Sequence, residues 1–220
     1  MMIPIRKRFK KFTGEFISDI VEYIKSQLEI NPNLTISVGC DSIQGKRKTL
    51  YTVTIMLYNG SIKNGAHVVF FRENVLKVRD NFERLHKEAN YVKEVGELLH
   101  SELDGHFERQ DLNDYERKRY KFHLQKCFGE FKNLTPFQEE NTINSLPLTE
   151  FEKIEKFNLV DLHLDFNPYE GDMDKRGFSK NRSNIAYKSF VPWLRGLGFR
   201  VFAKPMSYAS TNAADILLKN

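Results

Sequence analysis

Four acidic residues, far apart along the chain, occupy positions that solvation alone does not explain. Asp41 follows an alternating apolar segment, and Asp165 comes near the end of another. Glu88 lies inside an apolar stripe with helical spacing, and Asp215 lies in a short stretch of Ala, Ile and Leu residues. A carboxylate that faces a core is costly unless a partner or a metal compensates for its charge. Singly, each residue has a structural explanation, but together they indicate a shared site.

Carboxylates that converge on one site can bind divalent cations. They repel one another, so they stay ionised only when a cation lies among them. Oxygen ligands without a Cys/His set favour Mg²⁺ or Mn²⁺ over Zn²⁺. Two such ions about 4 Å apart can activate a water molecule and stabilise the leaving oxygen in phosphodiester hydrolysis. A cluster of this kind would therefore act on a phosphodiester.

Basic residues are concentrated in two runs of the chain. Lys and Arg (34) outnumber Asp and Glu (29) among the 220 residues, which gives a formal net charge of +5. The excess is local, because residues 1–11 and 175–204 contain Lys and Arg but no Asp or Glu, whereas 104–158 is net acidic. The second run lies between Asp165 and Asp215, as expected for a surface that follows a phosphate backbone, although such runs also occur on solvated faces. Its residues predicted to bind substrate are Lys180, Arg182 and Lys204.

The elements that must position these residues can be read from apolar periodicity. Helices are predicted over residues 15–28, 79–100 and 183–195, with a closing helix that begins at Ser210 or Thr211. Strands are predicted over residues 34–40, 49–58, 66–72, 159–166 and 200–203. Short connections make the first three strands an antiparallel meander, and the later alternation of strand and helix implies parallel pairing. The sequence therefore predicts an α/β fold in which helices cover a mixed sheet.

A single domain over residues 1–220 is the default for a chain of this length. Residues 104–158 form a long insertion between the second predicted helix and the fourth strand. Within it, helices are predicted near 114–128 and from Thr149, where Thr149 and Glu152 fit a capping box. Because the insertion is aromatic and net acidic, we expect it to dock a protein partner or to act as a lid rather than to clamp nucleic acid.

Short motifs surround the four acidic residues. The segment Val38–Gln44 reads VGCDSIQ, and Glu88 belongs to the pattern Arg84-Leu85-x-x-Glu88. Leu162-His163-Leu164-Asp165 forms a third motif, and a fourth runs from Gly196-Leu197-Gly198-Phe199 through Lys204-Pro205 to Ala214-Asp215. These motifs resemble those of the predicted RNase H-related nucleases typified by YkuK, over about residues 12–103 and 159–219. Cys40 replaces the Thr of that family, and we expect its side chain to point into the core.

The resemblance implies an RNase H-like fold with a five-stranded mixed sheet in the order 3-2-1-4-5, strands being numbered along the chain. It also implies that the four acidic residues are catalytic metal ligands for Mg²⁺ or Mn²⁺. We expect Asp41 and Asp165 to bridge two ions, and Glu88 and Asp215 to complete their coordination. The residues predicted to bind substrate are Lys204, His163, Ser42, Lys180 and Arg182.

One strand of this site carries two further polar residues. His163 shares the strand face of Asp165, so it could transfer a proton, hold a phosphate or serve the structure alone. Asp161 shares that face but lies further from the strand end, and we leave it out of the site.

The leading interpretation is a metal-dependent nuclease acting on RNA or DNA. One alternative is a non-catalytic module of the same fold that binds nucleic acid or joins a protein assembly, and another is a different phosphotransfer or resolvase activity. RNA and DNA are not distinguished, because that choice depends on contacts with the 2′-hydroxyl. The chain has only two cysteines and no recognisable secretory signal, which predicts a cytoplasmic protein. It also lacks an apolar run of about 18 residues, so we expect no membrane span.

Overall fold

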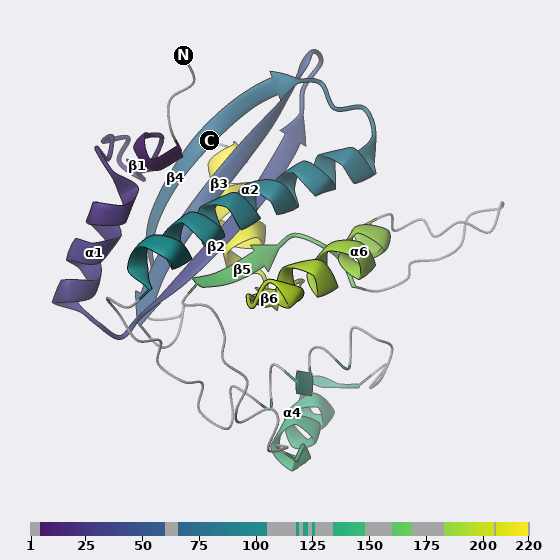
Figure 1. Ribbon diagram of the computed structural model, residues 1–220. Coiled ribbons are helices and arrows are strands. Elements are labelled where there is room, and N and C mark those ends of the chain that lie inside the picture. The colour runs from purple at the N-terminus through teal and green to yellow at the C-terminus, as the bar shows by residue number, and fades with distance from the viewer. Residues whose placement is uncertain are drawn as a thin grey trace.

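The computed structural model describes residues 5–59, 66–104, 118, 121–122, 125, 134–147, 160–168, 183–204 and 206–219. Figure 1 shows how its helices and strands are arranged. In chain order they are η1 (Ile5–Lys7), β1 (Lys10–Lys11), α1 (Ile20–Ile30), β2 (Leu34–Gln44), β3 (Lys48–Asn59), β4 (His67–Leu76), α2 (Asn81–Leu103), α4 (Pro136–Ser145), β5 (Val160–Leu164), α6 (Ser183–Gly196), β6 (Arg200–Phe202), η3 (Ala209–Ala214) and α7 (Asp215–Lys219).

A mixed sheet with the strand order β1-β4-β3-β2-β5-β6 forms the centre of the fold (Figure 1). β2, β3 and β4 pair antiparallel, whereas β5 pairs parallel with β2 and β6 pairs parallel with β5. The predicted α/β fold and the strand order 3-2-1-4-5 are therefore confirmed for β2 to β6. The predicted count of five strands is wrong, because the short β1 adds to β4 at the edge of the sheet.

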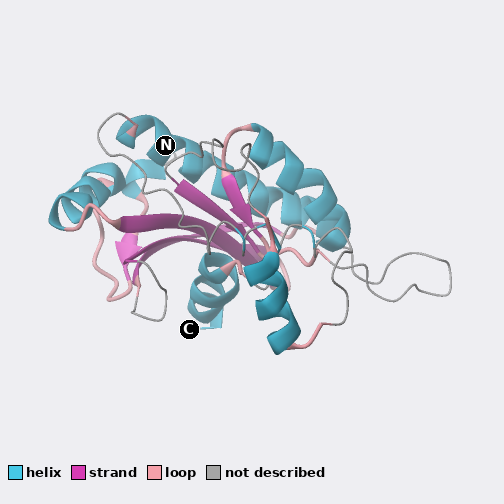
Figure 2. Ribbon diagram, turned by 90° about the horizontal axis from the view of Figure 1, so that it is seen from below, coloured by secondary structure: helices cyan, strands magenta, loops and turns pink. Residues whose placement is uncertain are grey.

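The two faces of the sheet are covered by different elements. On one face, α2 packs against β2, β3 and β5, and α1 and α6 pack against α2. The main core lies between these helices and the strands, and its members include Val38, Ile55, Val92 and Leu162. On the other face, η3 and α7 contact β2 and β3. Figure 2 accordingly shows helices on both sides of the sheet, with the C-terminus on the side away from α2.

A close backbone approach fixes the position of η3 on the second face. A Cβ atom at Gly39 of β2 would overlap backbone atoms of Ala209 and Ser210, so glycine is required there. The Ala209 N–H donates to His163 Nδ1 (3.0 Å), and the Ala209 carbonyl accepts from Thr54 Oγ1 (2.8 Å). η3 is a π-helix that continues into α7, so these contacts also set the position of Asp215.

β2 continues past the predicted end of its strand. It pairs with β3 along its whole length to Gln44, whereas its parallel pairing with β5 stops at Cys40 and Leu164. Asp41 therefore lies inside β2, at the first position beyond the β5 pairing, and not after the strand as predicted. Cys40 is buried in the main core, as expected.

The first helix begins later than its periodicity predicts. Asp19 accepts hydrogen bonds from the N–H groups of Val21 and Glu22, so it caps α1 at Ile20. Phe16, which the periodicity placed in the helix, is instead 75 % exposed and lies opposite Lys10 in a β-bridge. The prediction was wrong because a capping side chain, and not the apolar stripe, determines where this helix starts.

The described part of the insertion has a small apolar cluster of its own. Phe122, Ile143 and Leu146 are buried together, apart from the main core. α4, which the sequence analysis did not predict, begins with a capping box formed by Thr135 and Gln138. The residues described between 118 and 125 are helical, in agreement with the helix predicted near 114–128. The helix expected from Thr149 lies outside the described residues.

The helices also bear on the expected lack of a membrane span. α2 is 23 residues long but contains many charged side chains. Among the residues that the structure describes, no helix combines the length and the apolar composition of a membrane span.

Candidate active site

The four predicted acidic residues lie close enough for their charges to act on one another. Asp41 is on β2, Glu88 is on α2, Asp165 directly follows β5, and Asp215 opens α7. Burial, followed by the charges of Asp165 and Asp215, raises the pKa of Asp41 to about 6. Burial is also the main reason why the pKa of Glu88 rises to about 8, and the charges of Asp41 and Asp165 add to that rise. The charges of Asp165 and Asp215 thus act on Asp41, and those of Asp41 and Asp165 act on Glu88, while the role of the four residues as one site stays a prediction.

Glu88 is enclosed on the α2 side of this cluster and is only 1 % exposed. Its Oε1 accepts hydrogen bonds from Ser42 Oγ (2.5 Å) and Arg84 Nη1 (2.9 Å). Both contacts lower the pKa of Glu88, against the larger effect of burial. The other carboxylate oxygen, Oε2, is buried and has no hydrogen-bond partner among the described residues. The protein therefore supplies hydrogen-bond donors to one oxygen of this carboxylate and none to the other among the described residues.

Arg84 links α2 to the end of β2. Its Nη1 donates to Ser42 Oγ (2.7 Å) and to the Ser42 carbonyl (3.2 Å) as well as to Glu88. Its Nε and Nη2 donate to Asn81 Oδ1 at 3.2 and 2.8 Å. A guanidinium held at both ends in this way fixes the orientation of the Glu88 carboxylate.

Asp41 and Asp165 are half-buried and have different partners. Asp41 Oδ1 accepts from the backbone N–H of Ser42 (2.7 Å). Asp165 Oδ1 accepts from Thr211 Oγ1 (2.9 Å), and its Oδ2 lies 2.9 Å from Lys204 Nζ. Lys204 thus neutralises part of the cluster with a side chain that is 41 % exposed.

The four carboxylates do not form a closed coordination sphere. Within the described parts of the chain, no group of three or more His, Cys, Asp or Glu side chains is arranged to hold a metal ion. Asp41, Glu88 and Asp165 each have an oxygen turned to a donor of the protein itself. Metal coordination by the four residues therefore stays a prediction.

The other predicted substrate-binding residues lie in different settings. Ser42 and Lys204 lie in the cluster, where they contact Glu88 and Asp165. His163 is buried, and burial lowers its pKa to about 4, so the ring is neutral near pH 7. A neutral ring that accepts from Ala209 N–H favours the structural role over phosphate binding. Lys180 and Arg182 lie outside the described residues.

Sequence reasoning placed Arg84 in the motif of Glu88 and Thr211 at the start of a helix, but it assigned neither residue a role in the site. The spacing of Arg84 and Glu88, i and i+4 on a helix, is a signal that could have identified the pair. Thr211 meets Asp165 across 46 positions of sequence, and no local pattern reveals such a contact.

Comparison with known proteins adds one match. A family model described as Ribonuclease H-like matches residues 15–124, which is half of the chain and includes Asp41 and Glu88. No curated protein and no solved structure is significantly similar to the chain.

Proposed function

The chain belongs to the ribonuclease H-like family, as its resemblance to the YkuK proteins predicted, and on that basis we propose that it is a metal-dependent nuclease. The family indicates a nuclease-like function on nucleic acid. The proposed reaction is hydrolysis of phosphodiester bonds in RNA or DNA at Asp41, Glu88, Asp165 and Asp215. The observation that carries the proposal is the enclosed Glu88 carboxylate, which has only one of its oxygens hydrogen-bonded and a pKa that the charges of Asp41 and Asp165 help to raise.

The residues of the cluster fit a divalent cation of the Mg²⁺ or Mn²⁺ type. All four are carboxylates, the hard oxygen donors that these ions prefer. Glu88 Oε2 is buried and has no hydrogen-bond partner among the described residues. Leaving a buried polar group in this state costs about 1–3 kcal/mol, and more when it is charged. A cation bound at this oxygen would remove that cost. The raised pKa values of Asp41 and Glu88 support the same conclusion. Asp41, Glu88, Asp165 and Asp215 would hold two such ions.

The chain's own residues orient this site. When bound, two divalent ions would activate water and stabilise the leaving oxygen. Arg84 and Ser42 hold one oxygen of Glu88 and leave the other free to bind a cation. Thr211 holds Asp165, and Lys204 places an ammonium group beside it that would bind the substrate phosphate.

A cleavage screen tests the proposal. RNA, DNA and RNA–DNA hybrid strands are incubated with the purified protein and Mn²⁺ or Mg²⁺, with a chelator as the control. We expect metal-dependent cleavage that Asp41→Asn and Asp165→Asn abolish without changing the circular dichroism spectrum or the melting temperature. Asp104→Asn, at the exposed C-terminal cap of α2, is the matched variant that should keep activity. Undiminished cleavage by Asp41→Asn or in chelator would refute the site.

A second candidate function is a non-catalytic module that binds nucleic acid. The lack of a closed group of metal ligands in the described residues favours it. Such a module would bind nucleic acid more weakly as salt rises, with no response to divalent cations beyond their ionic strength, and would cleave none of the strands.

A further inference from the structure

Aromatic and basic side chains follow one row across the edge of the sheet. Phe16 lies opposite Lys10, Lys10 opposite Phe70, and Phe70 opposite Thr54. Thr54 in turn lies opposite Gly39, the residue beneath η3. Residues directly opposite each other point to the same face of a sheet. Phe16, Lys10 and Phe70 therefore lie on the face away from α2.

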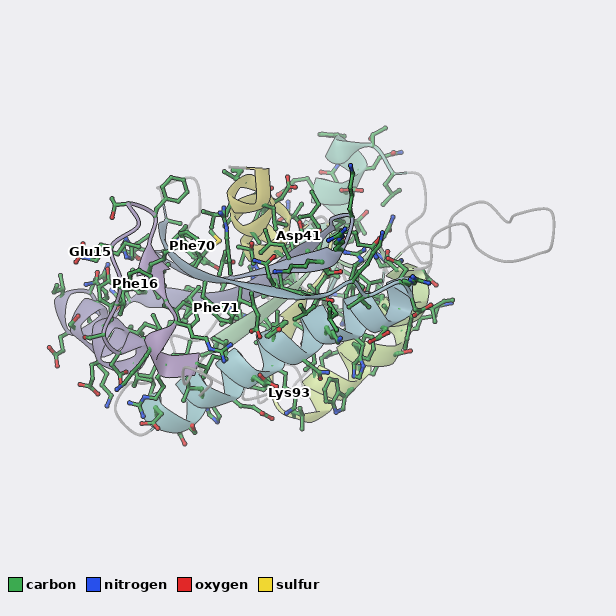
Figure 3. All side chains as sticks on the ribbon, turned by 90° about the horizontal axis from the view of Figure 1, so that it is seen from above. Glu15, Phe16, Asp41, Phe70, Phe71 and Lys93 are labelled. Atoms are coloured by element: carbon green, nitrogen blue, oxygen red, sulfur yellow. The ribbon has the colours of Figure 1, made fainter. Side chains whose placement is uncertain are left out.

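The neighbouring row on that face ends in the candidate active site. Arg72 lies opposite Thr52, and Thr52 lies opposite Asp41. In the edge-on view of Figure 3, Phe71 lies on the α2 side, whereas Phe70 and Asp41 lie toward the C-terminal helices. Strands are about 4.8 Å apart, so Arg72 lies about 10 Å from Asp41 across the sheet and Phe16 about 20 Å. Thr52 and Thr54, which separate them from β2, are buried on this face, where η3 and α7 pack against β3. Phe16, Lys10 and Arg72 therefore lie at the sheet edge, beside these helices and on the same face as Asp41.

Lys10 and Arg72 differ from three basic residues that lie near them in the sequence or the sheet. Arg6, Arg8 and Lys11 are each paired with a carboxylate. Among the described residues, Lys10 and Arg72 have no such partner, and both lie over the ring of Phe70, at 4.9 and 5.6 Å from its centre.

Phe70 and Phe16 have different exposures on this face. The two basic side chains cover Phe70, which is 4 % exposed, whereas Phe16 is 75 % exposed. Lys10 and Arg72 therefore offer two positive charges that no carboxylate among the described residues pairs with, and Phe16 offers an exposed aromatic ring.

We propose that Phe16, Lys10 and Arg72 form a binding track for single-stranded nucleic acid at the edge of the sheet, on the face that carries Asp41. This inference rests on the proposed nuclease function and names the substrate form. Lys10 and Arg72 neutralise phosphates, and Phe16 stacks on an unpaired base, the combination that binds single strands without sequence preference. A duplex keeps its bases stacked inside, so it gains the charge contacts alone.

Binding is measured by fluorescence anisotropy in the Asp41→Asn background, without divalent ions, so that cleavage does not interfere. The probes are labelled oligo-U and oligo-dT of about 20 nucleotides, longer than one binding site, and a duplex of equal length. Lys10→Gln/Arg72→Gln retains part of the aliphatic cover over Phe70 while removing both charges. We expect it to weaken single-strand binding at least tenfold and to reduce the salt slope by about 1.4, or about 0.7 per lost phosphate contact.

Phe16→Ser isolates the stacking contribution at an exposed position where folding is not at risk. We expect about fivefold or greater loss for both single strands and no loss for the duplex. The matched control is Phe137→Ser/Lys25→Gln/Lys87→Gln, which replaces one exposed Phe on α4 and two lysines paired with Glu on α1 and α2, and it should bind like the parent. Unchanged binding by the track variants, or an equal loss in the control, would overturn the track.

A cleavage measurement separates this inference from the proposed function. Bis(p-nitrophenyl) phosphate is small enough to contact the reaction centre alone. In an otherwise unmodified chain, the track variants should raise KM for long single strands about tenfold, with unchanged kcat and unchanged turnover of the small diester. A protein that binds through the track but cleaves neither substrate supports the track and refutes the nuclease. A protein that cleaves both, with KM unaffected by the track variants, refutes the track and leaves the nuclease intact.

Discussion

Two buried carboxylates in this fold are compensated to different degrees. Asp161 on β5 is fully buried and receives two hydrogen bonds from Arg200, one on each oxygen, with Nε at 2.9 Å. Glu88 on α2 is nearly as buried, but Arg84 and Ser42 both donate to the same oxygen. Both oxygens of Asp161 are therefore bonded to one guanidinium on the neighbouring strand, which is a structural role, and we call this the completed pair.

The acidic cluster around Glu88 has more negative than positive charge. Its four carboxylates face two basic side chains, Arg84 and Lys204. Burying charge in this way lowers stability, and such sites are retained where a cation or substrate supplies the missing partner. The comparison indicates that incomplete compensation, rather than burial alone, distinguishes the carboxylates of the proposed site from the structural Asp161.

The largest effect is expected from breaking the completed pair. Arg200→Met leaves Asp161 buried without its guanidinium, so the free energy of unfolding should fall by about 3–5 kcal/mol. Urea denaturation measures this loss. Asp161→Leu/Arg200→Met removes both charges and should recover most of the stability. A loss below about 1 kcal/mol in the single variant would show that the pair is not the structural unit described here.

The contact between η3 and β2 is the next most sensitive point. Gly39→Ala introduces a Cβ atom that overlaps the backbone of Ala209 and Ser210, so stability should fall by about 1–3 kcal/mol. The displaced η3 would also move Asp215 and weaken metal binding. Gly196→Ala is the matched control, because its Cβ would have nothing within 4 Å, and it should change stability by less than about 0.5 kcal/mol. Equal effects of the two substitutions would contradict the close approach.

The smallest change in stability has the opposite sign. Burial raises the pKa of Glu88 to about 8, so at neutral pH this side chain must bind a proton on folding, which lowers stability. Glu88→Gln needs no proton, so in chelator at neutral pH the free energy of unfolding should rise by about 1 kcal/mol. The same variant should lose cleavage activity. Thermal denaturation with the chelator present measures the first effect, and the strand-cleavage assay measures the second. A destabilised Glu88→Gln that still cleaves would place Glu88 with Asp161 among the structural residues.

Features carried by local patterns were predictable from the sequence. The order of β2 to β6 follows from alternation and connection length, and the exclusion of Asp161 by its distance from the strand end agrees with its pairing to Arg200. Features that depend on contacts distant in sequence were not predictable. The Thr211–Asp165 bond and the pairing of β1 with β4 join segments whose proximity is set by the packed sheet. Phe16 was misplaced because periodicity does not register the Asp19 cap.

The most direct test of the central claim is a titration of Mn²⁺ into the unmodified chain and into Glu88→Gln and Asp165→Asn, followed by electron paramagnetic resonance. The account predicts that the unmodified chain binds Mn²⁺ and that each substitution weakens binding at least tenfold, the order of loss expected when one ligand of a metal site is removed. A chain that binds no Mn²⁺, or binds it equally well in all three forms, would contradict the account.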